Sequence, residues 1–81
     1  PAVTYFKPAG KRKSELEEIR LSLEEFESLR LKDHEGLDQQ TCAQKMDISQ
    51  PTFHRLLHQA RKKLATGIVQ GNSIAIQKEQ I

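Results

Sequence analysis

Residues 49–64, with the sequence SQPTFHRLLHQARKKL, combine one apolar face with ionisable side chains of a single charge sign. The apolar residues recur at the spacing of one buried helix face, namely Phe53, Leu56, Leu57, Ala60 and Leu64. The ionisable residues on the other sides are all basic, namely His54, Arg55, His58, Arg61, Lys62 and Lys63. Such a helix can bury one side and present hydrogen-bond donors and positive charge on the other. These residue types indicate recognition of a polyanion.

The distribution of charge along the chain is uneven, although the net charge is only +2. Ten of the eleven acids fall between Glu15 and Asp47. Residues 48–77 contain no acid, against four Lys or Arg and two His. This asymmetry is typical of a face directed at a polyanion, but a solvated basic helix explains it equally well.

A helix-turn-helix pattern at residues 39–58 would position these basic side chains. Two helices that cross steeply need a small residue at the crossing, and Ala43 has the required size. Asp47 stands at the turn position, where Gly is most frequent because the backbone there is left-handed. Ile48 follows as an apolar plug, and Phe53 and Leu56 are the apolar anchors of the second helix.

Twelve side chains are candidates for contact with DNA. Those expected to enter the major groove and read base edges are Ser49, Gln50, Thr52, His54, Arg55 and His58. Gln can form two hydrogen bonds with adenine and Arg with guanine, while Ser and Thr reach several base edges or phosphates. Those expected to contact phosphate, at the amino end of helix 39–46 or along the basic helix, are Gln39, Gln40, Thr41, Arg61, Lys62 and Lys63.

Capping residues predict where the three helices begin and end. Ser22 with a glutamate three residues later forms a capping box for the first helix, which Gly36 ends in a left-handed conformation. Asp38 caps helix 39–46, and Ser49 caps the third helix, which Gly71 ends. The inward residues of helix 39–46 should be Cys42, Ala43 and Met46.

The two ends of the chain are expected to differ from this helical centre. Residues 1–14 are predicted to form a basic arm, since Pro8 and Gly10 interrupt regular structure. The arm's basic run, residues 11–13, is equally consistent with a DNA contact and a solvated linker. Residues 16–21 alternate apolar and polar types as a short strand does but also contain good helix formers, and we favour a strand. Residues 73–77 alternate in the same way and could pair with residues 17–21. The sequence therefore predicts a mostly α, three-helix helix-turn-helix domain over residues 15–81, with short terminal strands.

Segments along nearly the whole chain resemble known families. LSLEEFESLRLKDHEGLDQQTCAQKMDISQPTFHRLLHQARKKL, residues 21–64, resembles region four of bacterial sigma factors, which reads the promoter −35 element. VTYFKPAG at 3–10, LEEIRLSLEEFESLRLKD at 16–33 and ARKKLATGIVQGNSIAI at 60–76 are closer still to a prokaryotic family catalogued as domain of unknown function 134. The resemblance implies a DNA-binding protein with a sigma-region-four-like, winged-helix-like core. His54 stands where that family usually has a smaller residue, and the family's usual Arg- and Cys-containing segment before VTYFKPAG does not occur here.

Other site chemistries are less well supported by the residue pattern. Cys42 lies on an inward helix side, which favours a buried structural thiol over a redox sensor. His54 and His58 have the spacing of a metal pair, but no third ligand type lies nearby in sequence. The sequence has no catalytic motif, so we expect no enzyme, metal or cofactor. The single cysteine and the lack of a leader or long apolar run lead us to expect a cytoplasmic protein without a membrane span.

We therefore hypothesise that the chain is a transcription regulator that inserts helix 49–64 into the major groove of double-stranded DNA. A sigma-region-four-like interaction module that recruits RNA polymerase or another regulator is the alternative. Because one such unit buries little surface, a homodimer is a further expected partner.

Overall fold

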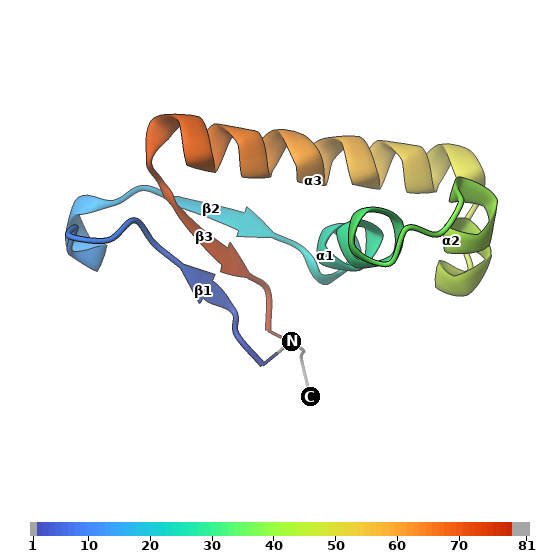
Figure 1. Cartoon of the computed structure of the whole chain (residues 1–81), viewed down its shortest axis with the longest axis horizontal. Helices are drawn as coiled ribbons and strands as arrows, with labels where there is room; N and C mark the ends of the chain where they lie inside the picture. Colours follow the sequence, from blue (N-terminus) through green and yellow to red (C-terminus); the bar gives the residue numbers. More distant parts are fainter. Residues whose placement is uncertain (1, 79–81) are drawn as a thin grey trace.

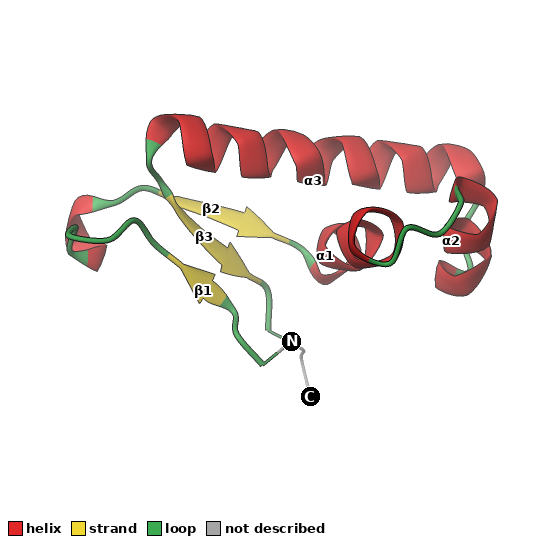
Figure 2. Ribbon diagram, viewed as in Figure 1, coloured by secondary structure: helices red, strands yellow, loops and turns green. Residues whose placement is uncertain are grey.

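The structure is a computed structural model that describes residues 2–78, and it contains three helices beside a small sheet (Figures 1 and 2). The strands are β1 (Tyr5–Phe6), β2 (Glu18–Leu21) and β3 (Ser73–Ile76). The helices are α1 (Leu23–Leu29), α2 (Gln39–Met46) and α3 (Gln50–Gln70), with a 3-10 turn, η1 (Lys13–Glu15), and a π-helical turn, η2 (Arg30–His34). The mostly α fold class with short terminal strands is confirmed.

Segments from both ends of the chain form one sheet, in the order β1-β3-β2. β2 runs parallel to β3 and places Ile19 beside Ile74, which confirms the pairing of residues 17–21 with 73–77. β1 runs antiparallel to β3 and places Phe6 beside Ile74. Strand β1 was not predicted from the sequence and lies inside the segment expected to be an arm. Residues 5–6 therefore form part of the folded unit.

Helix α3 spans the molecule and connects its two hydrophobic clusters (Figure 1). The first cluster, next to α2, has the buried residues Leu31, Cys42, Ala43, Phe53 and Leu57. The second, next to the sheet, has Leu21, Ala60 and Ile76. Leu29 packs against both clusters. Gly67 lets α3 approach β3 closely, because a Cβ at that position would lie 3.0 Å from the Ile74 side chain.

The predicted caps of the helices are confirmed. Glu25 N donates to Ser22 Oγ at 3.0 Å, and Ser22 N donates to Glu25 Oε1 at 2.9 Å, which completes the capping box. Gly36 and Gly71 have φ angles of +75° and +69°, and α3 ends immediately before Gly71. Each cap satisfies backbone groups that the helix itself leaves without a partner.

The turn η2 was not predicted from the sequence. Glu35 N donates to Arg30 O at 2.9 Å, across five residues rather than four. Such a widened turn shifts the angular position of the residues within it. Leu31 lies in this turn and is only 3% exposed, in contact with the first cluster.

Candidate nucleic-acid interface

The turn between α2 and α3 has the backbone that a helix-turn-helix requires. Asp47 adopts the left-handed conformation, with φ 56° and ψ 45°. It is the one residue other than glycine with a positive φ among residues 2–78. Ile48 N donates to Ala43 O at 3.1 Å, so the chain closes the end of α2 before it enters α3. The aspartate tolerates this conformation because its short polar side chain is among the least penalised there.

Buried apolar side chains hold α2 against α3 at this turn. Ala43 is 2% exposed at the contact, and Cys42 and Phe53 are fully buried beside it. Met46 and Ile48 pack against the same cluster from its edge. The inward face predicted for α2 is thus confirmed. The tight packing orients the amino-terminal half of α3 relative to the rest of the domain.

Four of the six predicted base-reading residues lie on the outside of this half of α3. The side chains of Gln50, His54, Arg55 and His58 are exposed, and they form no hydrogen bond or ion pair within the described part of the chain. The His54 and His58 rings stack at a centroid distance of 6.4 Å. These side chains form one outward surface, which we call the α3 outer face.

The other two, Ser49 and Thr52, act together as the cap of α3. Ser49 Oγ accepts a hydrogen bond from Thr52 N at 3.3 Å and donates to Thr52 Oγ1 at 2.9 Å. Thr52 is half-buried. Their hydroxyl groups are therefore already used within the protein, which leaves them less available to a base edge than the α3 outer face.

The amino end of α2, where three phosphate contacts were predicted, carries an acid. Asp38 accepts hydrogen bonds from Thr41 N at 2.8 Å and from Thr41 Oγ1 at 3.1 Å. The first of these bonds is the main cause of a lowered pKa for Asp38, so its carboxylate stays charged at neutral pH. Gln39 Nε2 reaches Gln50 O at 3.5 Å, and Gln40 is exposed. A phosphate placed here would meet the Asp38 carboxylate, and Gln40 is the predicted residue best able to donate to it.

The three basic residues 61–63 have different partners. Arg61 forms two hydrogen bonds with Asp33, at 3.0 and 2.6 Å. Lys63 Nζ lies 2.7 Å from Glu25 Oε1 and donates to Arg20 O at 2.8 Å. Lys62 is exposed and forms no ion pair with residues 2–78. Lys62 is thus the member of this run whose charge is directed outward.

Acids of the first half of the chain neutralise two of these cations, which was not predicted from the sequence. The hydrogen bond from Arg61 lowers the pKa of Asp33 and outweighs the opposing effect of burial. Burial acts to raise the pKa of Glu25, but hydrogen bonds from Lys63 and from Ser22 N prevail and lower it. Both carboxylates therefore stay charged at neutral pH.

The basic segment near the amino terminus lies at the opposite end of the molecule from α2 (Figure 1). The longest extent of the molecule is 40 Å. Lys7 Nζ donates to Lys11 O, Arg12 pairs with Glu15 at 3.0 Å, and Lys13 lies over the Tyr5 ring at 4.9 Å. The structure therefore does not bring this segment together with the α3 outer face.

Other chemistry has little support in this part of the molecule. Cys42 is fully buried, and burial raises the pKa of its thiol. Residues 2–78 contain no cluster of three or more His, Cys, Asp or Glu that could hold a metal ion. Among the helices described, none is both long and apolar enough to cross a membrane.

Comparison with known proteins identifies the family. The family model described as Protein of unknown function DUF134 matches residues 1–80. A UPF0251 protein of Moorella thermoacetica is 52% identical over 77 residues, which are 95% of this chain and 52% of that protein. UPF0251 proteins of Desulforudis audaxviator and Caldanaerobacter subterraneus subsp. tengcongensis are 53% and 51% identical over 95% of this chain, and over 50% and 65% of their own lengths.

The chain thus spans between half and two thirds of the length of these relatives. No solved structure matches it. The family model covers almost every residue of this chain, and the relatives are about 50% identical to it over the matched residues. This chain therefore belongs to the DUF134 family.

Proposed function

We propose that this chain binds double-stranded DNA through the α3 outer face and acts in transcription regulation. The observation that carries the proposal is the exposure of Gln50, His54, Arg55 and His58 directly after the helix-turn-helix turn. Their side chains form no hydrogen bond or ion pair among residues 2–78. Arg and Gln side chains in this position match the donor and acceptor patterns of guanine and adenine. The proposal includes a cytoplasmic location, where such a regulator would meet DNA.

The roles proposed for the basic residues depend on their partners in the fold. Arg55 would read a base, and Lys62 would contact a phosphate about two turns further along α3. Arg61 and Lys63 would act mainly within the protein, because each would have to leave a carboxylate to reach DNA. The side chains proposed to contact DNA directly are Gln50, His54, Arg55, His58 and Lys62.

A salt titration of duplex binding tests the proposal against the alternative of a protein-interaction module. A duplex pool enriched by in-vitro selection from random sequence supplies the probe, and fluorescence anisotropy measures the affinity. A DNA-binding chain should lose affinity steeply, with a log–log slope of about −0.9 for each phosphate neutralised. An affinity for the selected duplex no higher than for random duplex, together with a flat salt dependence, would refute the proposal.

Substitution of Arg55 tests base reading. Arg55→Ala should weaken binding to the selected duplex by about 1–3 kcal/mol and relax the preference at one position. Arg55→Lys is the matched variant, because it keeps the charge but cannot form two parallel hydrogen bonds with guanine. If Arg55→Lys retained the full sequence preference, the base-reading role would be wrong.

Substitution of Lys62 tests phosphate contact. Lys62→Ala should weaken binding to selected and random duplexes alike and reduce the salt slope by about 1. Lys11→Ala is the control, since it removes the same charge from an exposed site in the basic amino-terminal segment, which lies at the opposite end of the molecule from α2. An equal loss from both variants would mean that net charge, rather than a contact by Lys62, determines the affinity.

A further inference from the structure

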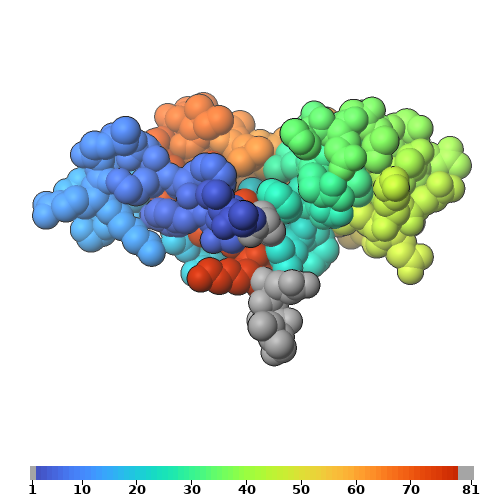
Figure 3. All heavy atoms as spheres, turned by 60° about the horizontal axis from the view of Figure 1, so that its bottom comes forward, coloured from blue at the N-terminus to red at the C-terminus, as the bar shows by residue number. Residues whose placement is uncertain are grey.

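A hollow with a volume of about 550 Å³ lies between α1 and α2. Figure 3 shows both helices on one face of the molecule, α1 in teal and α2 in yellow-green. The apolar side chains that line the hollow are Leu23, Phe26 and Met46, and all three are half-buried. Leu23 and Phe26 pack against the second hydrophobic cluster, and Met46 packs against the first. The hollow therefore combines an apolar lining with the size of a small-molecule site, which is typically about 300–1,000 Å³.

Two oppositely charged side chains line the same hollow. Glu24 comes from the first turn of α1, and Lys45 comes from the last turn of α2. Both are exposed, and neither side chain forms a hydrogen bond or ion pair within the described part of the chain. Because an ion pair requires its nitrogen and oxygen atoms to lie within about 4 Å of each other, the two charged groups are held apart. Each of them is therefore available to a charged group of a ligand.

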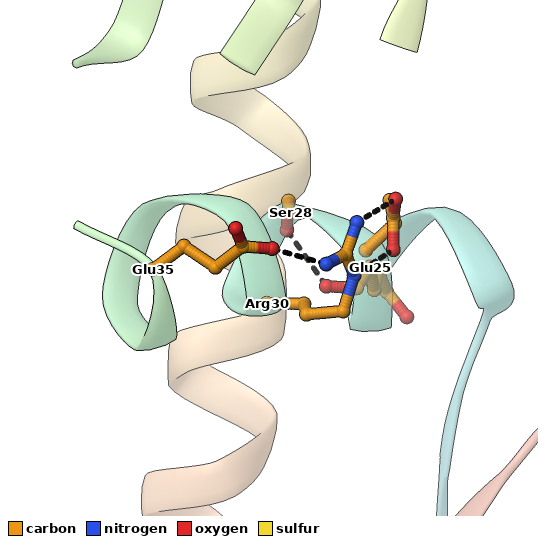
Figure 4. Close-up of polar contacts among 5 residues, drawn as sticks. Glu25, Ser28, Arg30 and Glu35 are labelled. Carbon is orange, nitrogen blue, oxygen red and sulfur yellow. Dashed lines mark hydrogen bonds and ion pairs between the residues drawn. The ribbon is translucent and has the colours of Figure 1, made fainter. Parts of the chain in front are cut away.

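The other charged side chains of the hollow, Glu27 and Arg30, are already paired. Arg30 Nε and Nη2 donate to Glu27 Oε1 and Oε2 at 2.7 and 2.8 Å. Arg30 also pairs with Glu35, a contact that Figure 4 shows. Among residues 2–78, the hollow thus presents one carboxylate and one ammonium group without a charged partner.

We propose that this hollow binds a small zwitterion with an apolar body, of which an apolar α-amino acid such as leucine is the simplest. Lys45 would donate to the ligand carboxylate, and Glu24 would accept from the ligand ammonium group, in hydrogen bonds strengthened by charge. The apolar body would lie against Leu23, Phe26 and Met46. A ligand with a single charge would leave either Glu24 or Lys45 without a partner, so both ligand charges are needed.

Glu24 and Lys45 each also suit the end of the helix that carries them. An acid in the first turn and a base in the last turn interact favourably with the helix dipole. A role confined to the dipole would affect the stability of the fold but would bind no ligand. A binding measurement therefore distinguishes the two roles.

The proposed site is separate from the α3 outer face, none of whose side chains lines the hollow. The proposal therefore does not depend on the proposed function. Met46 packs against the cluster that holds α2 to α3, and Asp47 of the turn follows it directly. A ligand that contacts Met46 in the folded state would stabilise this part of the fold.

Titration of the isotope-labelled chain with leucine, followed by NMR, tests the proposal. A ligand of this size at an exposed site should bind with a dissociation constant on the order of 1 mM. The amide shifts should concentrate at Leu23, Glu24, Lys45 and Met46. Isocaproate and isoamylamine are the matched ligands, because the first is leucine without its ammonium group and the second is leucine without its carboxylate. Each should bind at least about tenfold more weakly than leucine.

Substitution of either charge should have a similar effect. Glu24→Gln and Lys45→Met should each weaken leucine binding by about tenfold, since each removes one charge and keeps the size of the side chain. Glu17→Gln and Lys11→Met are the controls, because they remove the same charges from exposed positions that do not line the hollow. Far-UV circular dichroism verifies that each variant is folded.

The absence of shifts at about ten times the expected dissociation constant would overturn the proposal. Binding of isocaproate or isoamylamine as tight as that of leucine would also overturn it, and so would control variants that weaken binding as much as Glu24→Gln and Lys45→Met. Duplex binding without leucine binding refutes this site alone, and leucine binding without duplex affinity refutes the proposed function alone.

Discussion

Lys62 and Lys63 are adjacent in the sequence, but the surroundings of their ammonium groups differ. Lys63 lies against Glu25, whose side chain is only 5% exposed, whereas Lys62 is directed into solvent. A buried carboxylate needs a positive partner because its desolvation is otherwise uncompensated. Lys63 is therefore expected to act in the stability of the fold, and Lys62 in contact with a partner.

Replacement of Lys63 should make the fold sensitive to acid. The pKa of Glu25 is lowered from its ordinary value of 4.5, so this group stabilises the fold above pH 4.5 and the stabilisation disappears as pH falls below it. Lys63→Met removes the ammonium group that counteracts the effect of burial on Glu25, so the pKa of Glu25 should rise. We expect a loss of about 2 kcal/mol at pH 7, less than the roughly 3–5 kcal/mol of a fully buried pair, because the Lys63 side chain is 40% exposed.

Urea unfolding at several pH values measures this effect, with Lys62→Met as the control of equal size and charge. The acid midpoint of Lys63→Met should move to higher pH than that of the wild type. Lys62→Met should follow the wild-type curve. If both variants kept the wild-type midpoint, the Glu25–Lys63 pair would contribute nothing to stability.

At the scale of elements, residue types near helix ends were the most informative part of the sequence. Ser22, Asp38 and Ser49 accept the hydrogen bonds expected of caps, since capping is decided within a few residues. The π-helical turn η2 and strand β1 were not predicted. Strand β1 consists of two residues and exists only through its pairing with β3, which is a long-range contact that local spacing does not contain.

The candidate site likewise has features that were predicted from the sequence and features that were not. The exposure of Arg55 and His58 followed from helical periodicity, because the inward residues fix the outward ones. The pairing of Arg61 with Asp33, across 28 residues, could not follow from it. A count of acids along the chain separated the acidic and basic halves, but folding brings the two halves together. Which cations remain without an acidic partner is thus decided by tertiary contacts.

At the scale of the whole molecule, α3 is expected to couple the two hydrophobic clusters, so that the domain unfolds as one unit. It runs through both hydrophobic clusters, and Leu29 packs against both. Each cluster alone contains few buried residues, so neither is expected to be stable without the other. A domain of this size normally unfolds in a single cooperative transition.

Ile76→Ala tests this cooperativity from the sheet side of the molecule. Ile76 is 6% exposed in the second cluster, and its truncation should cost about 2–4 kcal/mol. Tyr5 on β1 is the single tyrosine in a chain without tryptophan, so its fluorescence reports on the sheet, while far-UV circular dichroism reports mainly on the helices. In urea the two signals should change at one shared midpoint, lower in Ile76→Ala than in the wild type. A tyrosine transition that precedes the helical one would instead mean that the sheet opens separately, and that the helix-turn-helix can remain folded without the strands from the two ends of the chain.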